Sequence, residues 1–146
     1  MEKTIIIKIV NKSQNPLPAY QTSGAAGMDI CANEDVTLKM GEISLVSTGL
    51  YMQIPPGYEA QIRCRSGLAL KYGVALVNGI GTIDSDYRGE IKIIMTVLKS
   101  TPFAIKKGDR IAQVVFARYV QADVVCVETL EDTVRSSGGF GSSGIR

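Results

Sequence analysis

The sequence contains no histidine. A Ser-His-Asp triad, a Cys-His pair and a histidine metal ligand are therefore excluded. If the protein is an enzyme, proton transfer falls to Asp, Glu, Lys, Tyr or Cys. Any metal would be a hard ion bound through oxygen, such as Mg²⁺.

Cysteine is also scarce. The chain has 3 cysteines, Cys31, Cys64 and Cys126, and no C-x-x-C motif. An odd count at wide spacing argues against both a disulfide framework and a zinc site. We therefore expect free thiols and a reducing, cytoplasmic compartment.

Long apolar runs and a strong net charge are missing as well. No stretch reaches the roughly 18 apolar residues of a membrane span. The first ten residues are interrupted by Lys8 and resemble a strand more than a signal peptide. A net charge of +2 over 146 residues favours neither a nucleic acid nor a membrane partner. The length and the 45% hydrophobic content fit one globular domain.

What is present is a period of two. From Tyr58 onward, apolar residues alternate with polar ones as far as Arg65, which is typical of a half-buried strand. Further segments rich in β-branched residues are separated by turn signals such as Asn78-Gly79. The pattern predicts an all-β jelly-roll-like sandwich or barrel. The predicted strands cover residues 5–10, 43–54, 58–65, 90–98, 111–120 and 124–127.

One short helix is expected over residues 66–72, with Ser66 as its cap. The end of the chain differs from the rest, because residues 135–144 are mostly glycine and serine and cannot bury enough surface to order themselves. They could form a frayed tail, but Arg135 and Phe140 among the glycines suggest a flap that closes on a ligand. We therefore divide the chain into a β domain, 1–132, and a flexible arm, 133–146.

Three segments carry possible chemistry. Residues 139–144 match G-x-G-x-x-G, but no strand–helix unit surrounds them, so a dinucleotide fold is rejected. Arg65-Ser66-Gly67 joins a strand end to a helix start, an arrangement that suits a phosphate. Residues 83–89 crowd two carboxylates, a tyrosine and an arginine into one turn, which is either a solvated hairpin tip or a site.

Together the motifs identify a family. The chain resembles the trimeric dUTPases through five ordered segments: AAGMDI at 25–30, RSGLA at 65–69, GTIDSDYRG at 81–89, GDRIAQ at 108–113, and Arg135 followed by GGFGSSG at 138–144. The resemblance implies a jelly-roll homotrimer with active sites at subunit interfaces. It also implies Mg²⁺-assisted hydrolysis of dUTP to dUMP and pyrophosphate, which keeps uracil out of DNA and supplies dUMP for dTMP synthesis.

By the same resemblance, Asp84 is the general base that activates water for attack on the α-phosphorus. Ser66 and Gln113 complete the catalytic group, and Asp29 holds the Mg²⁺ through water. Tyr87 packs beneath the deoxyribose and excludes a 2′-hydroxyl. The remaining substrate contacts implied are Arg65, Gly67, Asn78, Thr82, Ile83, Lys92, Arg135, Phe140 and Gly141.

Met28, Ser136 and Ser143 depart from residues common in the family. Three other hypotheses for the function stay open. A dCTP deaminase shares this fold, a dUTPase-like protein can act as a regulatory binding partner, and a purely structural β domain needs no site.

Overall fold

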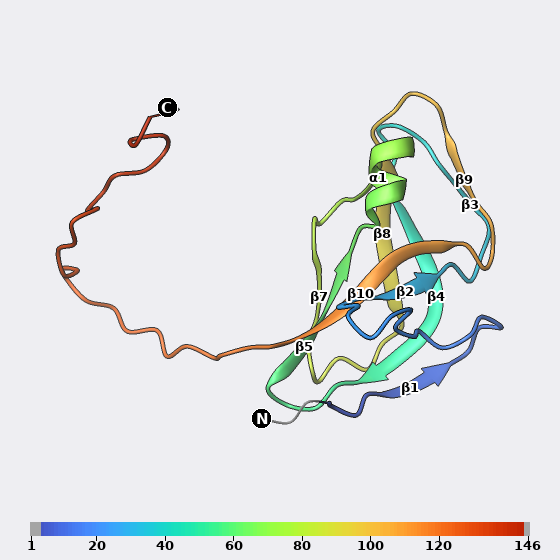
Figure 1. The fold of residues 1–146 in the computed structure, drawn as a ribbon, viewed down its shortest axis with the longest axis horizontal. Helices are drawn as coiled ribbons and strands as arrows, with labels where there is room; N and C mark the ends of the chain where they lie inside the picture. Colours follow the sequence, from blue (N-terminus) through green and yellow to red (C-terminus); the bar gives the residue numbers. More distant parts are fainter. Residues whose placement is uncertain (1–3, 145–146) are drawn as a thin grey trace.

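The computed structural model describes residues 4–144 and has the mostly β architecture that the sequence predicts (Figure 1). Positions 1–3 of the predicted domain and 145–146 of the predicted arm lie outside the described residues. The elements are β1 (Lys8–Asn11), β2 (Met28–Cys31), β3 (Val36–Leu38), β4 (Ser44–Gln53), β5 (Tyr58–Arg63), α1 (Ser66–Tyr72), β6 (Val74–Leu76), β7 (Gly81–Ile83), β8 (Ile91–Val97), β9 (Phe103–Ile105) and β10 (Arg110–Arg118).

The strands form two four-stranded antiparallel sheets and a short two-stranded one. One large sheet has the order β1-β4-β8-β6, and the other has the order β2-β10-β5-β7. Strands β3 and β9 pair with each other. The prediction of an all-β, jelly-roll-like fold with one short helix is confirmed.

The core lies between the inner faces of the two large sheets. Along β8, Ile91, Ile93, Met95 and Val97 are buried and alternate with more exposed residues. Side chains such as Ile62 on the other sheet are also fully buried in this core. Each fully buried isoleucine contributes about 1.5–3 kcal/mol, so the alternation fixes which face of each strand turns inward.

Helix α1 forms where it was predicted, but its cap was predicted wrongly. The N-cap is Arg65, in an extended conformation and without a capping hydrogen bond from its side chain. Ser66 is already the first helical residue, and it is exposed. The helix ends at Gly73, whose φ of 71° is left-handed and whose N–H donates to the carbonyl of Ala69.

The long central strands were predicted well, whereas a strand at 124–127 was wrong. These residues belong to no strand, and Val124 is 94% exposed. Their β-branched composition favours an extended chain, but a strand also needs a neighbour to bond with. The short strands β2, β3, β6, β7 and β9 were missed, because three or four residues give too little periodicity.

The sequence suggested that residues 83–89 could form the tip of a hairpin, but the structure shows that they do not. Strand β7 pairs with β5 in one sheet, whereas β8 pairs with β4 and β6 in the other. The turn therefore carries the chain from one sheet to the other. We call residues 84–90 the crossing turn.

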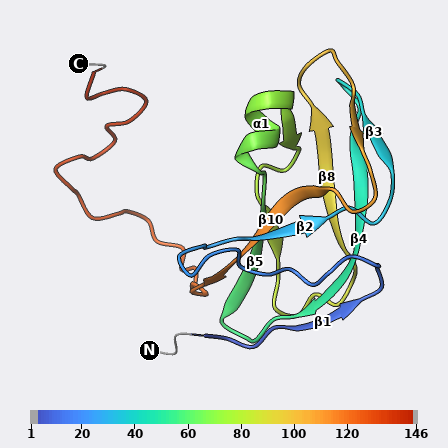
Figure 2. The same cartoon turned by 45° about the vertical axis from the view of Figure 1, so that its right-hand side comes forward.

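Strand β10 ends at Arg118, and residues 120–137 are all exposed. In both ribbon views this segment runs away from the sheets toward the C-terminus (Figures 1 and 2). Nowhere in residues 4–144 is there a helix of the length and apolarity that a membrane crossing requires.

Candidate active site

A pocket of about 540 Å³ opens beside the crossing turn. The end of β7, the turn itself and the start of β8 supply most of its lining. Its volume falls in the range of small-molecule sites. Five of the residues implied by the family resemblance line it: Thr82, Ile83, Asp84, Tyr87 and Lys92.

The crossing turn is closed by its own polar groups. The N–H of Tyr87 donates to the carbonyl of Asp84 at 3.2 Å. Arg88 donates to the carbonyls of Ser85 and Tyr87, at 2.7 and 3.0 Å. Arg88 therefore stabilises the turn, which leaves the carboxylate of Asp84 exposed toward the pocket.

Glu90 is the carboxylate at the end of the crossing turn. It accepts hydrogen bonds from the Ser47 hydroxyl and from the Gly49 N–H, and its other oxygen lies 3.7 Å from Nζ of Lys92. Burial raises the pKa of Glu90, but these donors outweigh it, so the pKa lies below its ordinary value. Glu90 is thus held ionised at the pocket wall.

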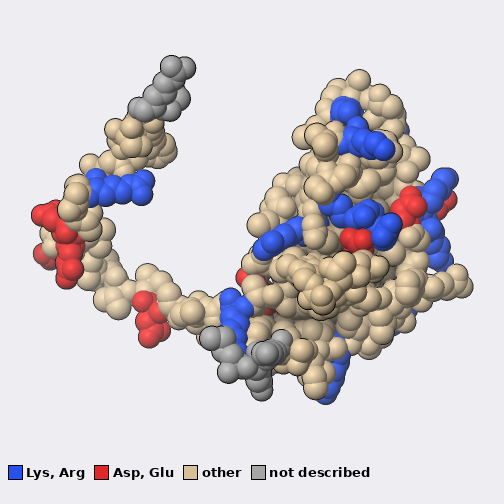
Figure 3. Space-filling model, viewed as in Figure 1, with Lys and Arg blue, Asp and Glu red and all other residues tan. Residues whose placement is uncertain are grey.

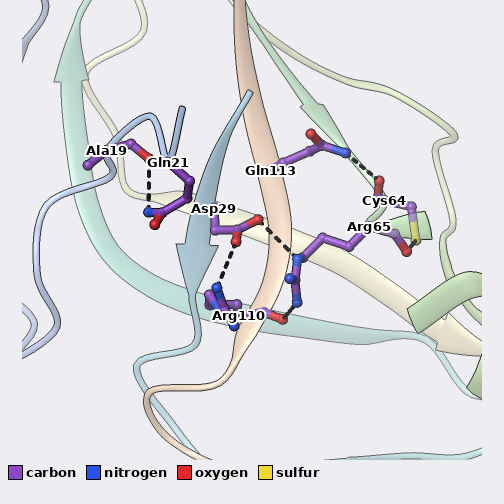
Figure 4. A network of polar contacts seen from close by, with 7 residues as sticks. All are labelled: Ala19, Gln21, Asp29, Cys64, Arg65, Arg110 and Gln113. Carbon is purple, nitrogen blue, oxygen red and sulfur yellow. Dashed lines mark hydrogen bonds and ion pairs between the residues drawn. The ribbon is translucent and has the colours of Figure 1, made fainter. Parts of the chain in front are cut away.

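A second group of polar residues, the Asp29 cluster (Asp29, Arg65 and Arg110), lies at strands β2, β5 and β10, which do not line the pocket (Figure 4). Asp29 Oδ1 lies 3.0 Å from Nε of Arg65, and Oδ2 lies 3.4 Å from a terminal nitrogen of Arg110. Arg65 also donates to the carbonyl of Arg110 at 3.0 Å. One carboxylate between two guanidinium groups leaves an excess of positive charge, which suits an anion.

Strand order explains this cluster. Strand β10 lies between β2 and β5, so Gln113 stands opposite Asp29 on one side and Arg63 on the other. Arg65 follows two residues after Arg63 and reaches back across β10 to Asp29. On the face of the β domain seen in Figure 3, negative side chains lie next to positive ones, and uncharged surface covers much of the rest.

The side chain of Gln113, on β10, reaches the end of β5, where Cys64 and Arg65 lie. Its amide donates to the carbonyl of Cys64 at 3.0 Å, and its oxygen occupies the space that a side chain at Gly27 would fill. Burial raises the pKa of Cys64, so this thiol is protonated at neutral pH. Gln113 is therefore held by the main chain of Cys64, two residues before the exposed Ser66 at the start of α1.

The side chains near Asp29 limit how a metal ion could be held. Residues 4–144 contain no group of three His, Cys, Asp or Glu side chains that could hold an ion. Each carboxylate oxygen of Asp29 faces one arginine nitrogen and has a further lone pair that could accept a hydrogen bond. The donors therefore fit a water-mediated contact to a metal that another ligand carries, and not direct binding by the protein alone.

The remaining predicted residues lie apart from both groups. Asn78 is exposed in the turn between β6 and β7 and does not line the pocket. Arg135, Phe140 and Gly141 lie on the segment that leaves the sheets, and Phe140 is fully exposed. Arg135 donates to the carbonyl of Gly138 at 2.9 Å, a contact within the arm itself.

Comparison with known proteins places the chain in a family. The dUTPase family profile matches residues 13–144. The chain is 51% identical over 140 residues to a deoxyuridine 5'-triphosphate nucleotidohydrolase of Finegoldia magna, covering 94% of this chain and 98% of that protein. The Cytophaga hutchinsonii protein of the same name is 52% identical over 143 residues, covering 97% and 93%. The chain belongs to the dUTPase family.

Solved dUTPase structures have the same fold. The dUTPase of Staphylococcus bacteriophage 80alpha with dUpNHpp superposes with a TM-score of 0.83 at 26% identity, covering 97% of this chain and all of that chain. A mutant of this phage dUTPase, also with dUpNHpp, gives a TM-score of 0.87 at 25% identity over the same share.

The dUTPase motifs pointed to both polar groups but missed two of their members. Arg110 lies inside the GDRIAQ motif, yet only the order of β2, β10 and β5 brings it to Asp29. Glu90 directly follows the GTIDSDYRG motif, and its role depends on contacts to a distant strand, β4. The available signal was a charged residue inside a motif for Arg110 and one directly after a motif for Glu90.

Proposed function

We propose that the protein hydrolyses dUTP to dUMP and pyrophosphate, which keeps uracil out of DNA and supplies dUMP for dTMP synthesis. The observation that carries this proposal is the identity of 51–52% to two nucleotidohydrolases named for deoxyuridine 5'-triphosphate, over almost the whole chain. The pocket beside the crossing turn supports it, because it gathers a carboxylate, a phenol and strand-end backbone in a space suited to a nucleoside.

Asp84 is the proposed general base. Its carboxylate accepts a proton from water as the water oxygen bonds to the α-phosphorus. The bond from that phosphorus to the bridging oxygen breaks, and pyrophosphate leaves with the electron pair. In a protein without histidine, a carboxylate is the natural acceptor, and the turn that Arg88 closes holds this one at the pocket.

The Asp29 cluster with Ser66, Gly67 and Gln113 is the proposed phosphate side of the site. Arg65 and Arg110 offer guanidinium donors, and α1 begins next to them with an exposed hydroxyl and no side-chain cap. Positioning and charge neutralisation are the main contributions that a protein can make to such a reaction.

Mg²⁺ is the proposed cofactor. The triphosphate would supply most of its oxygen ligands, and Asp29 would accept a hydrogen bond from water on the ion. When bound, the ion would neutralise charge on the phosphate chain. This fits a donor set that offers one carboxylate and no cluster of three acids within residues 4–144.

On the nucleoside side, Tyr87 is proposed to lie under the deoxyribose. Backbone groups of Thr82, Ile83 and Lys92 would pair with the edge of uracil, and Asn78 would contact the base or sugar. Mismatched donors and acceptors would reject cytosine more strongly than a lost methyl contact could.

We further propose a homotrimer with shared sites. One chain holds the pocket, the Asp29 cluster and the arm as separate groups, and the exposed Phe140 does not line its own chain's pocket. Residues from neighbouring copies would complete each site. Arg135, Phe140 and Gly141 would close over the nucleotide after it binds.

The free thiols of Cys31, Cys64 and Cys126 support the proposal of a cytoplasmic location.

The deciding experiment incubates the protein with dUTP, UTP, dCTP and dTTP in the presence of Mg²⁺ and measures pyrophosphate. Release from dUTP alone, lost on chelation of the metal and restored by Mg²⁺, is the expected result. Ammonia from dCTP would establish a deaminase instead. Binding of dUTP without any product would favour a regulatory module.

A further inference from the structure

We propose that Glu90 is a positioning residue that sets the discrimination between deoxyribose and ribose by fixing Tyr87 in the pocket wall. The inference rests on the proposed function, because it concerns which sugar the pocket accepts. Glu90 itself need not touch the nucleotide.

The carboxylate of Glu90 is held by main-chain and side-chain donors of β4. The Ser47 hydroxyl and the Gly49 N–H both donate to Oε1, the latter at 3.0 Å, and Lys92 lies 3.7 Å from Oε2. Its side chain is 18% exposed. A partly buried carboxylate with three donors is costly to leave unpaired, so these contacts define one position for Glu90.

The donors converge because β4 carries a bulge at this point. The pairing of β4 with β8 shifts register between Ser47 and Leu50, and Gly49 has a left-handed φ of 71°. Thr48, 1% exposed within the bulge, donates to the carbonyl of Ile91 at 2.5 Å. The bulge is thus tied to the residue after Glu90 as well as to Glu90 itself.

Tyr87 depends on this anchor. Because the crossing turn joins two sheets, no ladder of strand hydrogen bonds runs between β7 and β8 to hold it. The phenol of Tyr87 instead donates to the main-chain carbonyl of Glu90 at 3.0 Å. The ring passes over Gly89, where an added Cβ would overlap the phenol. Moving Glu90 therefore moves the oxygen that fixes the ring.

The expected consequence is selective. A ring that shifts away from the sugar makes room for a 2′-hydroxyl, which improves UTP more than it harms dUTP. A purely structural role would instead lower turnover of both substrates in parallel. The ratio of kcat/KM for dUTP to that for UTP separates the two roles.

The test compares Glu90→Ala with Glu90→Gln, which keeps an oxygen for Ser47 and Gly49. Glu90→Ala should lower the dUTP/UTP ratio about tenfold or more, in line with the discrimination that a pocket achieves on one small substrate group, mainly through a gain in kcat/KM for UTP. Glu90→Gln should restore most of the ratio. Glu42→Ala, at an exposed glutamate before β4, is the matched control and should leave it unchanged.

Gly89→Ala displaces the ring directly and leaves the Glu90 carboxylate in place, so it should lower the same ratio even if Glu90→Ala folds poorly. An unchanged ratio in Gly89→Ala, or a parallel loss for both substrates in Glu90→Ala at an unchanged Tm, would overturn the inference. A parent protein that fails to hydrolyse dUTP would overturn the proposed function itself, which the same assay reports separately.

Discussion

At the scale of single residues, the crossing turn holds two aspartates in different surroundings. Asp84 lines the pocket, whereas Asp86 lies two residues on and lines a different surface hollow. Asp84→Asn keeps the size of the side chain and removes its basic oxygen. We expect kcat to fall by about 10²–10⁴-fold, while binding of a non-hydrolysable dUTP analogue persists in calorimetry.

Asp86→Asn makes the same chemical change in the same turn and serves as its control. It should keep kcat within about twofold of the parent value, in keeping with a surface substitution. Full turnover by Asp84→Asn would disprove the proposed base.

Glu90 also predicts a pH dependence of stability. Its pKa is raised by burial but lowered more by Ser47, Gly49 and Lys92, and so lies below the ordinary 4.5. A carboxylate with a depressed pKa in the folded state contributes stability above its unfolded pKa. That contribution is lost as the pH falls through the folded value. The Tm difference between the parent and Glu90→Gln should therefore be constant near neutral pH and shrink below pH 4.5.

Thermal melts from neutral to acidic pH, with Glu42→Gln as the matched exposed control, measure this difference. A Tm difference that widens on acidification would contradict the assigned contacts.

The dUTPase motifs predicted Asp84 and Tyr87 from neighbours in sequence. They missed the contacts of Glu90 to β4, because Ser47 and Gly49 lie more than forty positions away along the chain.

At the scale of elements, prediction succeeded where a strand is long and half-buried. Strands β4, β8 and β10 have enough residues for a period of two to stand out. Residues 124–127 have strand composition but no partner strand among residues 4–144, and composition cannot supply the partner. The crossing turn was mistaken for a hairpin for a related reason, because pairing is a property of the sheet and not of the turn.

The arm is the element with the clearest test. Its glycines and serines bring little apolar area and much backbone entropy, and its hydrogen bonds are local turns such as the one from Ser142 to Gly139, 3.0 Å. We expect the arm to be mobile without nucleotide and ordered with a non-hydrolysable dUTP analogue. Backbone NMR order parameters measure this directly.

Removing residues 135–146 should abolish most turnover and leave the Tm of the β domain almost unchanged, because the described part of this segment is almost entirely exposed. Substituting Phe140→Ala within the full chain is the finer version of the same change. A truncated protein with unchanged kcat/KM would show that the segment is a frayed tail.

At the scale of the whole molecule, one chain leaves its polar groups divided between two sheets and an arm. Apolar side chains such as Leu45 and Ile80 are also more than half exposed, at 57% and 52%. Contacts between copies in the proposed homotrimer would cover apolar surface of this kind. We expect light scattering to report about three times 15.7 kDa.

An active monomer at assay concentration would refute the shared sites. Mixing the Asp84→Asn protein with the arm-truncated protein offers a second measurement, because mixed trimers should regain part of the activity that each variant lacks on its own.

The sequence predicted the fold class from periodicity and the assembly from family resemblance. Periodicity alone could not predict the assembly, since it describes one chain and its own core.

Gly49 has one more consequence, for mutagenesis. Its φ of 71° is left-handed, and an added Cβ would come within 2.9 Å of the backbone nitrogen of Ser13. In a library of random variants selected for nucleotide hydrolysis, this position should tolerate as little change as Asp84, although it lies outside the pocket. A map of mutational sensitivity would therefore mark a site of folding constraint as if it were a contact, unless abundance were measured alongside activity.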